Sequence, residues 1–340
     1  MRSVIYHQYG EPSVVLHLTE VPELPAPAEG EVLIRVRSRP VHPGDLIGIR
    51  GRYRAPGNNA PVGPDGARPG FEGVGVIEAV GAGIDPARGL TPGARVAFFP
   101  ARWAWSDRVL APARFVTPIP DDVPDAVAAQ LHVAPLTAAL LLRAAQEAGA
   151  QRGDVIALSA AGGLVARVTA RLLLDAGYQP LGVVRSEQAA AALSQQTPQM
   201  EFLSTEQADW ARKIFPLTKG RPVKVVLDAV GGKVASTLAA LLADGGALIS
   251  YGDLSATPLE LPALSFSTRG ISIRGVSVGR WPALPDAVRA ADLAMAISLA
   301  QSAPDIFRVA AEYGLAAVGE AVQHAERAGK DGAVLLTELR

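Results

Sequence analysis

A run of small residues in the centre of the chain could bind the diphosphate of a dinucleotide. The apolar stretch 154–158 is too short for a helix, and apolar positions recur at helical spacing from 164 to 176. This pattern predicts a strand, a turn and a helix. A diphosphate reaches the N–H groups of a helix N-terminus only where no side chain intervenes. We expect it to contact Ser159, Ala160, Ala161, Gly162, Gly163 and Leu164. The turn departs from G-x-G-x-x-G, with Ser at 159 and Val at 165, and the alternative is an ordinary bend.

A cation at the end of the next predicted strand indicates which dinucleotide binds. Residues 181–184 form an apolar run that ends at Arg185 and Ser186. Enzymes that use NAD usually carry an acid here for the ribose 2′-hydroxyl, whereas a cation suits a 2′-phosphate. The sequence therefore predicts NADPH, held by Arg185 and Ser186. The alternative for Arg185 is a solvated surface side chain.

A parallel sheet is needed to hold these residues together. Apolar runs at 154–158, 180–184, 200–203, 223–228 and 245–250 alternate with helical segments, which predicts a parallel sheet covered on both faces. Residues 1 to about 120 instead show short strands joined by Gly/Pro turns. After a strand at 271–276 we expect helices near 282–302 and 304–313. A last strand at 332–337 could return to the first domain.

Composition narrows the class of protein. The net charge of −1 argues against nucleic acid or an anionic membrane as a partner. The chain has no cysteine, which rules out disulfides, thiolate metal sites and a Cys nucleophile. Its first residues lack the apolar core of a signal peptide, and no apolar stretch approaches about 18 residues. We expect a soluble cytoplasmic protein that acts on a small molecule.

Several segments, in this order and spacing, resemble the zinc-free branch of the medium-chain dehydrogenase/reductase superfamily. Residues 42–53, His-Pro-Gly-Asp through Gly-Arg-Tyr, resemble N-P-x-D-x-x-x-x-x-G-x-Y of the mitochondrial-type 2-enoyl thioester reductases. Residues 228–232 match D-x-V-G-G, and 135–138 and 244–252 match segments beside the coenzyme. The chain is also similar to the zeta-crystallin-like quinone oxidoreductases. Ala134 stands where relatives carry Asn, Val276 and Ser277 replace two aromatic residues, and Ala333 replaces a Lys; these departures leave the substrate open.

The resemblance implies an α/β fold in which a Rossmann doubly wound parallel sheet accompanies a GroES-like β-rich catalytic domain. We expect the first part of the catalytic domain at 1–122, the NADP-binding domain at 123–269 and the return to the catalytic domain at 270–340. Relatives form dimers through the edge of the Rossmann sheet, so a homodimer through 270–274 is expected. An unpaired edge strand is otherwise a liability.

The resemblance also implies roles for individual residues. Tyr53 is the candidate proton donor, with structural packing as the alternative. Trp281 is a candidate for the substrate pocket, with packing as the alternative. The residues expected beside the coenzyme are Thr137, Val230, Tyr251 and Gly252, with an ordinary helix residue as the alternative for Thr137.

The sequence predicts no metal site. In G-H-E-x-x-G of the zinc alcohol dehydrogenases, the His position is Phe71 here, and Glu72 remains. His42 and Asp45 lie near the first ligand position but do not supply the three protein ligands of a catalytic zinc. The alternative to a ligand role for His42 is a structural one, as a hydrogen-bonded residue near a turn. The remaining chemistry is hydride transfer from NADPH to an enone, a quinone or a 2-enoyl thioester. The alternative is an NADPH-binding sensor or structural protein without turnover.

Overall fold

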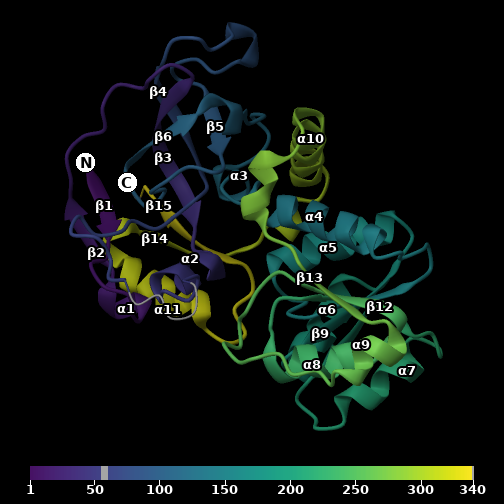
Figure 1. Cartoon of the computed structure of the whole chain (residues 1–340). Coiled ribbons are helices and arrows are strands. Elements are labelled where there is room, and N and C mark those ends of the chain that lie inside the picture. The colour runs from purple at the N-terminus through teal and green to yellow at the C-terminus, as the bar shows by residue number, and fades with distance from the viewer. Residues whose placement is uncertain (55–59, 339–340) are drawn as a thin grey trace. The chain divides into compact units, whose positions relative to one another are not determined.

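The alternating apolar runs in the middle of the chain form a six-stranded parallel sheet (Figure 1). The computed structural model describes residues 1–54 and 60–338 and divides into two units. Unit 2, Ala134–Ala283, holds this sheet in the order β10-β9-β8-β11-β12-β13. Its strands are β8 (Val155–Leu158), β9 (Gln179–Val184), β10 (Glu201–Ser204), β11 (Val223–Asp228), β12 (Leu242–Ser250) and β13 (Ser272–Gly275). The order confirms the predicted doubly wound sheet.

Alternate residues of the central strand β8 enter separate cores on the two faces of the sheet. Val155 and Ala157 of β8 pack with Trp210 in one apolar cluster, whereas Ile156 and Leu158 pack in another. Successive side chains of a strand point to opposite faces, so a strand buried on both faces must be apolar throughout. The helical elements are α4 (Val133–Glu147), α5 (Leu164–Asp175), α6 (Glu187–Gln196), η3 (Trp210–Lys213), α7 (Ile214–Leu217), α8 (Gly232–Ala240), α9 (Leu264–Arg269) and η4 (Val278–Ala283).

Unit 1, formed by Met1–Val133 and Leu284–Arg340, contains a seven-stranded sheet. Five of its strands come from the first third of the chain: β3 (Glu31–Pro40), β4 (Gly73–Val80), β5 (Arg95–Phe98), β6 (Arg108–Pro112) and β7 (Val116–Pro118). Two come from the C-terminal part: β14 (Val309–Gly314) and β15 (Ala333–Thr337). β15 pairs antiparallel with β3, which confirms that the last strand returns to the first domain. A separate pair is formed by β1 (Arg2–Ile5) and β2 (His17–Glu20).

The described residues of unit 1 also form five helices. They are α1 (Pro12–Val15), α2 (Pro43–Ile49), α3 (Asp125–Ala128), α10 (Asp286–Ser302) and α11 (Val318–Glu326), with 3₁₀ turns η1 (Pro86–Arg88), η2 (Ala113–Phe115), η5 (Pro304–Ile306) and η6 (Leu315–Ala317). Leu46 and Ile49 of α2 pack with Val318 and Val322 of α11 in one apolar cluster. This packing fixes α2, which carries candidate site residues at its N-terminal end.

The structure corrects one expectation about the C-terminal part and confirms another. The predicted helix at 304–313 is wrong: a single 3₁₀ turn is followed by strand β14, which pairs in parallel with β15. Ala310, Ala311 and Glu312 favour a helix locally, but the pairing with β15 prevails. The strand expected at 271–276 is present as β13, and it pairs with β12 in the sheet of unit 2.

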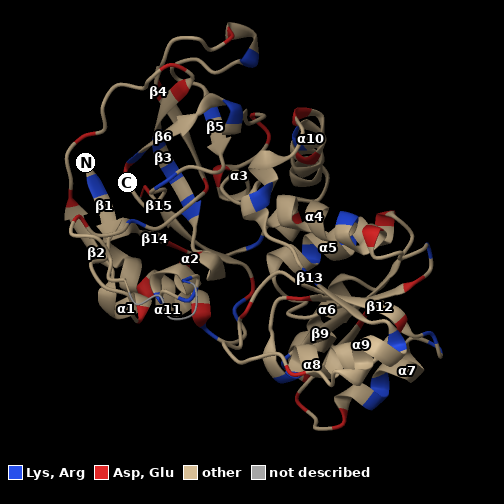
Figure 2. Ribbon diagram, viewed as in Figure 1, with Lys and Arg blue, Asp and Glu red and all other residues tan. Residues whose placement is uncertain are grey.

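Positive and negative side chains are distributed over both units (Figure 2), in keeping with the net charge of −1. Figure 2 shows Lys and Arg interspersed with Asp and Glu in each unit. In the part of the chain that the structure describes, no helix combines the length and the apolar character required to cross a bilayer.

Candidate functional site

The turn between β8 and α5 exposes backbone at the point where the strand order of the sheet reverses. β8 neighbours both β9 and β11, and ligands of such sheets bind beyond the carboxyl ends of these strands. Gly162 and Gly163 are exposed, and Gly163 is the N-cap of the 12-residue helix α5. A Cβ built on Gly162 would meet only Leu193, at 3.8 Å. The turn therefore leaves open space at a helix N-terminus, which fits an anionic group.

Only some N–H groups of this turn are available to a ligand. The N–H of Ser159 donates to Leu227 at 3.1 Å, that of Ala161 to Val183 at 3.1 Å, and that of Gly163 to Ala160 at 2.9 Å. Within the described residues no acceptor is present for the N–H groups of Gly162 and Leu164. The first turn of a helix leaves its N–H groups without intrahelical acceptors. The N–H groups free to bind phosphate therefore begin at Gly162 and continue into α5.

Ser159 holds the turn from inside the protein. Its side chain is fully buried, and its hydroxyl donates to Asp228 Oδ1 at 2.6 Å and accepts from the N–H of Ala229 at 2.9 Å. Asp228 Oδ2 accepts from the N–H of Gly231 at 2.8 Å. These bonds join the ends of β8 and β11. The Ser that breaks the glycine pattern is thus a link between strands, and its hydroxyl is committed to that link instead of to a ligand.

The segments that follow β11 and β12 cross closely beside this link. The N–H of Tyr251 donates to Asp228, and the carbonyl of Val230 accepts from Ser255, both at 2.8 Å. A Cβ on Gly252 would lie 2.8 Å from the Ala229 carbonyl oxygen, so a side chain does not fit there. Burial, with the charge of Asp228, raises the pKa of Tyr251, so its phenol stays protonated at neutral pH. The structure thus brings Val230, Tyr251 and Gly252 together at the carboxyl ends of the strands.

Arg185 and Ser186 follow β9 and differ in their availability. Arg185 is exposed, and its guanidinium has no hydrogen bond or ion pair with any residue in the described ranges. The Ser186 hydroxyl accepts from the N–H of Ala189 at 3.2 Å and caps α6. Of the two predicted 2′-phosphate contacts, Arg185 therefore has its side chain free to bind, while Ser186 serves the helix.

Thr137 and Trp281 lie in packed surroundings. Thr137 stands in the second turn of α4 and is 6% exposed. Trp281 lies in η4 and is 1% exposed, among the largest fully buried side chains. So little exposed surface favours the packing alternative for Trp281.

Tyr53 lies beside α2 in unit 1. Its side chain is 69% exposed. Gly44 and Gly48, four residues apart and hence on one face of the helix, leave room for it: a Cβ on Gly44 would lie 3.3 Å from the Tyr53 hydroxyl oxygen, and one on Gly48 would lie 3.7 Å from its ring. The phenol is therefore both accessible and seated against the N-terminal part of α2.

A buried ionisable cluster lies at the same end of α2. His42 Nε2 is 2.6 Å from Glu72 Oε1, and the His42 N–H donates to Asp45 Oδ2 at 3.0 Å. Burial raises the pKa of Asp45 to about 6. Burial lowers the pKa of His42, but the charge and hydrogen bond of Glu72 outweigh it, so the pKa is raised overall. His42 is thus a hydrogen-bonded residue near a turn, as its alternative interpretation expected, but no sequence pattern indicates its partner Glu72, 30 residues away.

The Glu72 carboxylate also binds backbone. Its Oε2 accepts from the N–H groups of His132 at 3.1 Å and Val133 at 2.7 Å, where α4 begins. His132 itself is buried, and burial lowers its pKa to about 4, so its ring is neutral. Among the described residues, no group of three or more His, Cys, Asp or Glu side chains is arranged to hold a metal ion.

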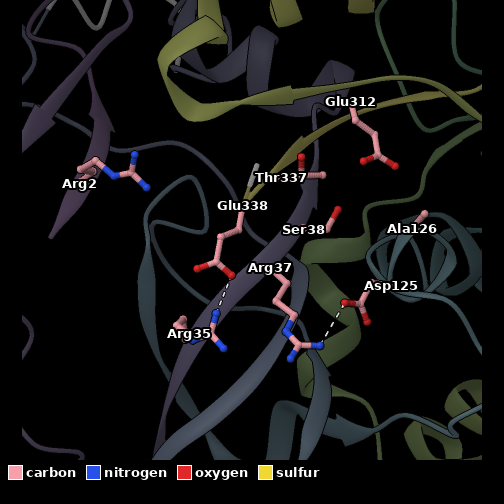
Figure 3. A pocket seen from close by; sticks show the side chains of 9 residues that line it. All are labelled: Arg2, Arg35, Arg37, Ser38, Asp125, Ala126, Glu312, Thr337 and Glu338. Atoms are coloured by element: carbon pink, nitrogen blue, oxygen red, sulfur yellow. Dashed lines mark hydrogen bonds and ion pairs between the residues drawn. The ribbon is translucent and has the colours of Figure 1, made fainter. Parts of the chain in front are cut away.

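A separate cavity of about 630 Å³ lies beside β3 and β15 in unit 1 (Figure 3). Arg35 pairs there with Glu338 at 2.5 Å, and Arg37 with Asp125 at 3.5 Å. None of the predicted site residues lines it. Its arginines already have acidic partners, so it offers no unbalanced charge to a coenzyme phosphate.

Known proteins match the chain over both units. The family model described as "Alcohol dehydrogenase GroES-like domain" matches residues 28–121, and that described as "Zinc-binding dehydrogenase" matches 164–292. The mitochondrial enoyl-[acyl-carrier-protein] reductase of Dictyostelium discoideum is 29% identical over 288 residues, covering 82% of this chain and 78% of the relative. A mycobacterial structure complexed with NADPH is 26% identical with a TM-score of 0.85, over 99% of this chain and 100% of the other. A mycobacterial quinone oxidoreductase is 26% identical with a TM-score of 0.78, over 99% of each chain.

The GroES-like unit, the doubly wound sheet and these matches define an oxidoreductase of the dehydrogenase/reductase type. The chain belongs to the medium-chain dehydrogenase/reductase superfamily, as its sequence motifs indicated.

Proposed function

We propose that this chain is an NADPH-dependent reductase of activated C=C bonds or quinones that needs no metal ion. The observation that carries the proposal is the exposed turn at Gly162 and Gly163, at the switch point of the sheet, with Arg185 at the end of β9, whose guanidinium has no partner among the described residues. The mycobacterial relative complexed with NADPH supports the choice of coenzyme. A nicotinamide coenzyme, when bound, supplies hydride to the electron-poor carbon of the substrate.

Each part of the coenzyme has residues of this chain assigned to it. The N–H groups of Gly162 and the first turn of α5 hold the diphosphate, and Arg185 holds the 2′-phosphate. Ser159 and Asp228 keep the turn in place from beneath. Thr137, Val230, Tyr251 and Gly252 shape the nicotinamide end. Because Cβ at position 252 would meet Ala229, the glycine preserves the close crossing of the two loops.

Tyr53 is the proposed proton donor. Reduction of a conjugated C=C bond leaves negative charge on the carbonyl oxygen and the α-carbon, and a proton must reach that carbon. A phenol is protonated at neutral pH and can donate without further tuning. The exposed Tyr53 hydroxyl, seated beside Gly44, has the access that such a role requires.

Tyr53→Phe separates the two substrate classes. For a 2-enoyl thioester, loss of the positioned proton donor should lower kcat by about 10²- to 10⁴-fold. Quinone oxygens take protons from water, so quinone reduction should change little. Tyr9→Phe, on a tyrosine of the same unit, is the matched control. NADPH consumption with crotonyl thioesters, enones and quinones is the assay, and unchanged thioester reduction would remove Tyr53 from the mechanism.

The alternative function, NADPH binding without turnover, is an outcome of the same assay. Tight coenzyme binding with no NADPH oxidation by any thioester, enone or quinone would favour a sensor or structural protein. Trp281, the candidate residue of the substrate pocket, is buried and has almost no surface to offer a substrate. This burial is the observation that favours the alternative.

We also propose a homodimer through the edge of the parallel sheet. β13 pairs only with β12 among the described strands, so its other edge is open. Ile273 of β13 is 42% exposed, and Leu264 and Phe266 of the neighbouring α9 are 69% and 38% exposed. An open edge strand beside exposed apolar side chains is typical of a self-association surface. The cytoplasmic location and the absence of nucleic-acid and membrane partners stay predictions from the sequence.

A further inference from the structure

Glu72 binds two segments of unit 1 that are distant in sequence. It is 1% exposed and directly precedes β4. One carboxylate oxygen meets the His42 ring at the N-cap of α2, and the other accepts from the N–H groups of His132 and Val133. A buried carboxylate is costly unless it is well hydrogen-bonded, and this one has three partners. These three contacts hold the Glu72 carboxylate in place. The carboxylate in turn holds the His42 ring and the segment 132–133.

The two backbone N–H groups lie where the chain passes from unit 1 to unit 2. The boundary falls between Val133 and Ala134, and α4 runs on from Val133 to Glu147. A negative charge at a helix N-terminus is favourable, because the N–H groups there lack intrahelical acceptors. Thr137 follows Val133 by four residues, one helical turn later. Glu72 thus holds the first turn of α4 through the N–H groups of His132 and Val133.

His42 supplies the charge that balances Glu72. The groups that act electrostatically on His42 are Glu72, Asp45 and Lys330, and Glu72 contacts its ring at hydrogen-bond distance. Thioester reductases carry Asn where this chain has His42, so the ion pair is a feature of this sequence. A hydrogen bond between ionised partners is stronger than a neutral one. The imidazolium form therefore holds the Glu72 carboxylate more firmly than neutral His42 does.

We propose that Glu72 is a positioning residue of this reductase: held by His42, it fixes the first N–H groups of α4 and thereby the place of Thr137 beside the nicotinamide. The inference rests on the proposed function for its catalytic consequence only. The anchoring of α4 by Glu72 does not depend on that function and can be tested in the protein without coenzyme. Glu72 touches neither substrate nor coenzyme in this account and acts through the helix.

Glu72→Gln tests the inference with a side chain of the same shape and no charge. Displacement of a reacting group by about 1 Å can cost about 100-fold in rate, so we expect kcat to fall by about 10- to 100-fold. The Kd for NADPH should change little, because the diphosphate turn lies on another element. Hydrogen exchange at the N–H groups of His132, Val133, Ala134 and Leu136 should become faster in the full-length protein without coenzyme. Glu78→Gln, at an exposed position of β4, should change neither quantity.

His42→Asn provides a second variant that keeps both Glu72 bonds to α4. In the wild type, kcat should decline as pH rises through the pKa of His42, because the charge that supports Glu72 is then lost. This decline should disappear in the variant. Wild-type kcat and unchanged hydrogen exchange in Glu72→Gln would overturn the positioning role. Failure of the wild-type protein to bind NADPH would overturn the proposed function, while the exchange measurement would still decide whether Glu72 anchors α4.

Discussion

Arg185→Ala should discriminate between the two nicotinamide coenzymes. Arg185 is exposed, and within residues 1–54 and 60–338 its guanidinium has no partner, so its removal should leave the fold without coenzyme nearly unchanged. A hydrogen bond to a charged group contributes about 1.5–3 kcal/mol. At about 1.4 kcal/mol per tenfold, this is about 10- to 150-fold in affinity. The loss should fall on NADPH, because NADH lacks the 2′-phosphate that the guanidinium would contact.

Calorimetric titration of both coenzymes into wild type and variant measures this difference directly. Arg185→Lys retains a positive charge but lacks the planar fork of donors, so its NADPH affinity should lie between those of the wild type and Arg185→Ala. Arg212→Ala, on another exposed arginine of unit 2, controls for a general loss of positive charge. Higher salt should narrow the difference, since an exposed charge is screened. An equal loss of NADPH and NADH affinity on Arg185→Ala would refute the assignment.

Three further predictions concern the supports of the site and the assembly. Ser159→Ala leaves the Asp228 carboxylate with one partner fewer, and should lower the free energy of unfolding by about 1–3 kcal/mol in denaturant titrations; an unchanged midpoint would contradict the strand link. Asp45 has its pKa raised from 3.8 to about 6, so the folded state keeps a proton that the unfolded state has lost, and stability falls as pH rises through this window. The advantage of Asp45→Asn over wild type should therefore grow by at most about 3 kcal/mol between these pH values, and a pH-independent difference would contradict the buried acid. Ile273→Asp should convert the proposed dimer to a monomer in light scattering, and a monomeric wild type would remove the dimer.

Local sequence patterns were enough to predict the parallel sheet. The apolar run 223–228 coincides with β11, because a strand buried on both faces has no polar positions to interrupt it. The segment 304–313 was mistaken for a helix for the opposite reason. Its alanines suit a helix, and only the pairing with β15, a contact outside the segment, makes residues 309–314 a strand.

In the candidate site, too, local sequence placed some residues, whereas contacts between residues distant in sequence could not be predicted. Gly162 and Arg185 follow strands directly, so their positions at the carboxyl ends could be derived from the sequence. The ion pair of His42 with Glu72, and the bond of Ser159 to Asp228, join residues 30 and 69 positions apart. No periodicity brings such residues together, because the contacts depend on how α2, β4 and the sheet pack.

The central claim is that a coenzyme diphosphate binds the free N–H groups that begin at Gly162. Hydrogen exchange resolved to single N–H groups, with and without NADPH, tests it most directly. Slower exchange at Gly162, Leu164 and Val165 on addition of NADPH is the predicted result, with no comparable change for Ala161, whose N–H is already bonded to Val183. Binding of NADPH that leaves the exchange of Gly162 and Leu164 unchanged would contradict the account.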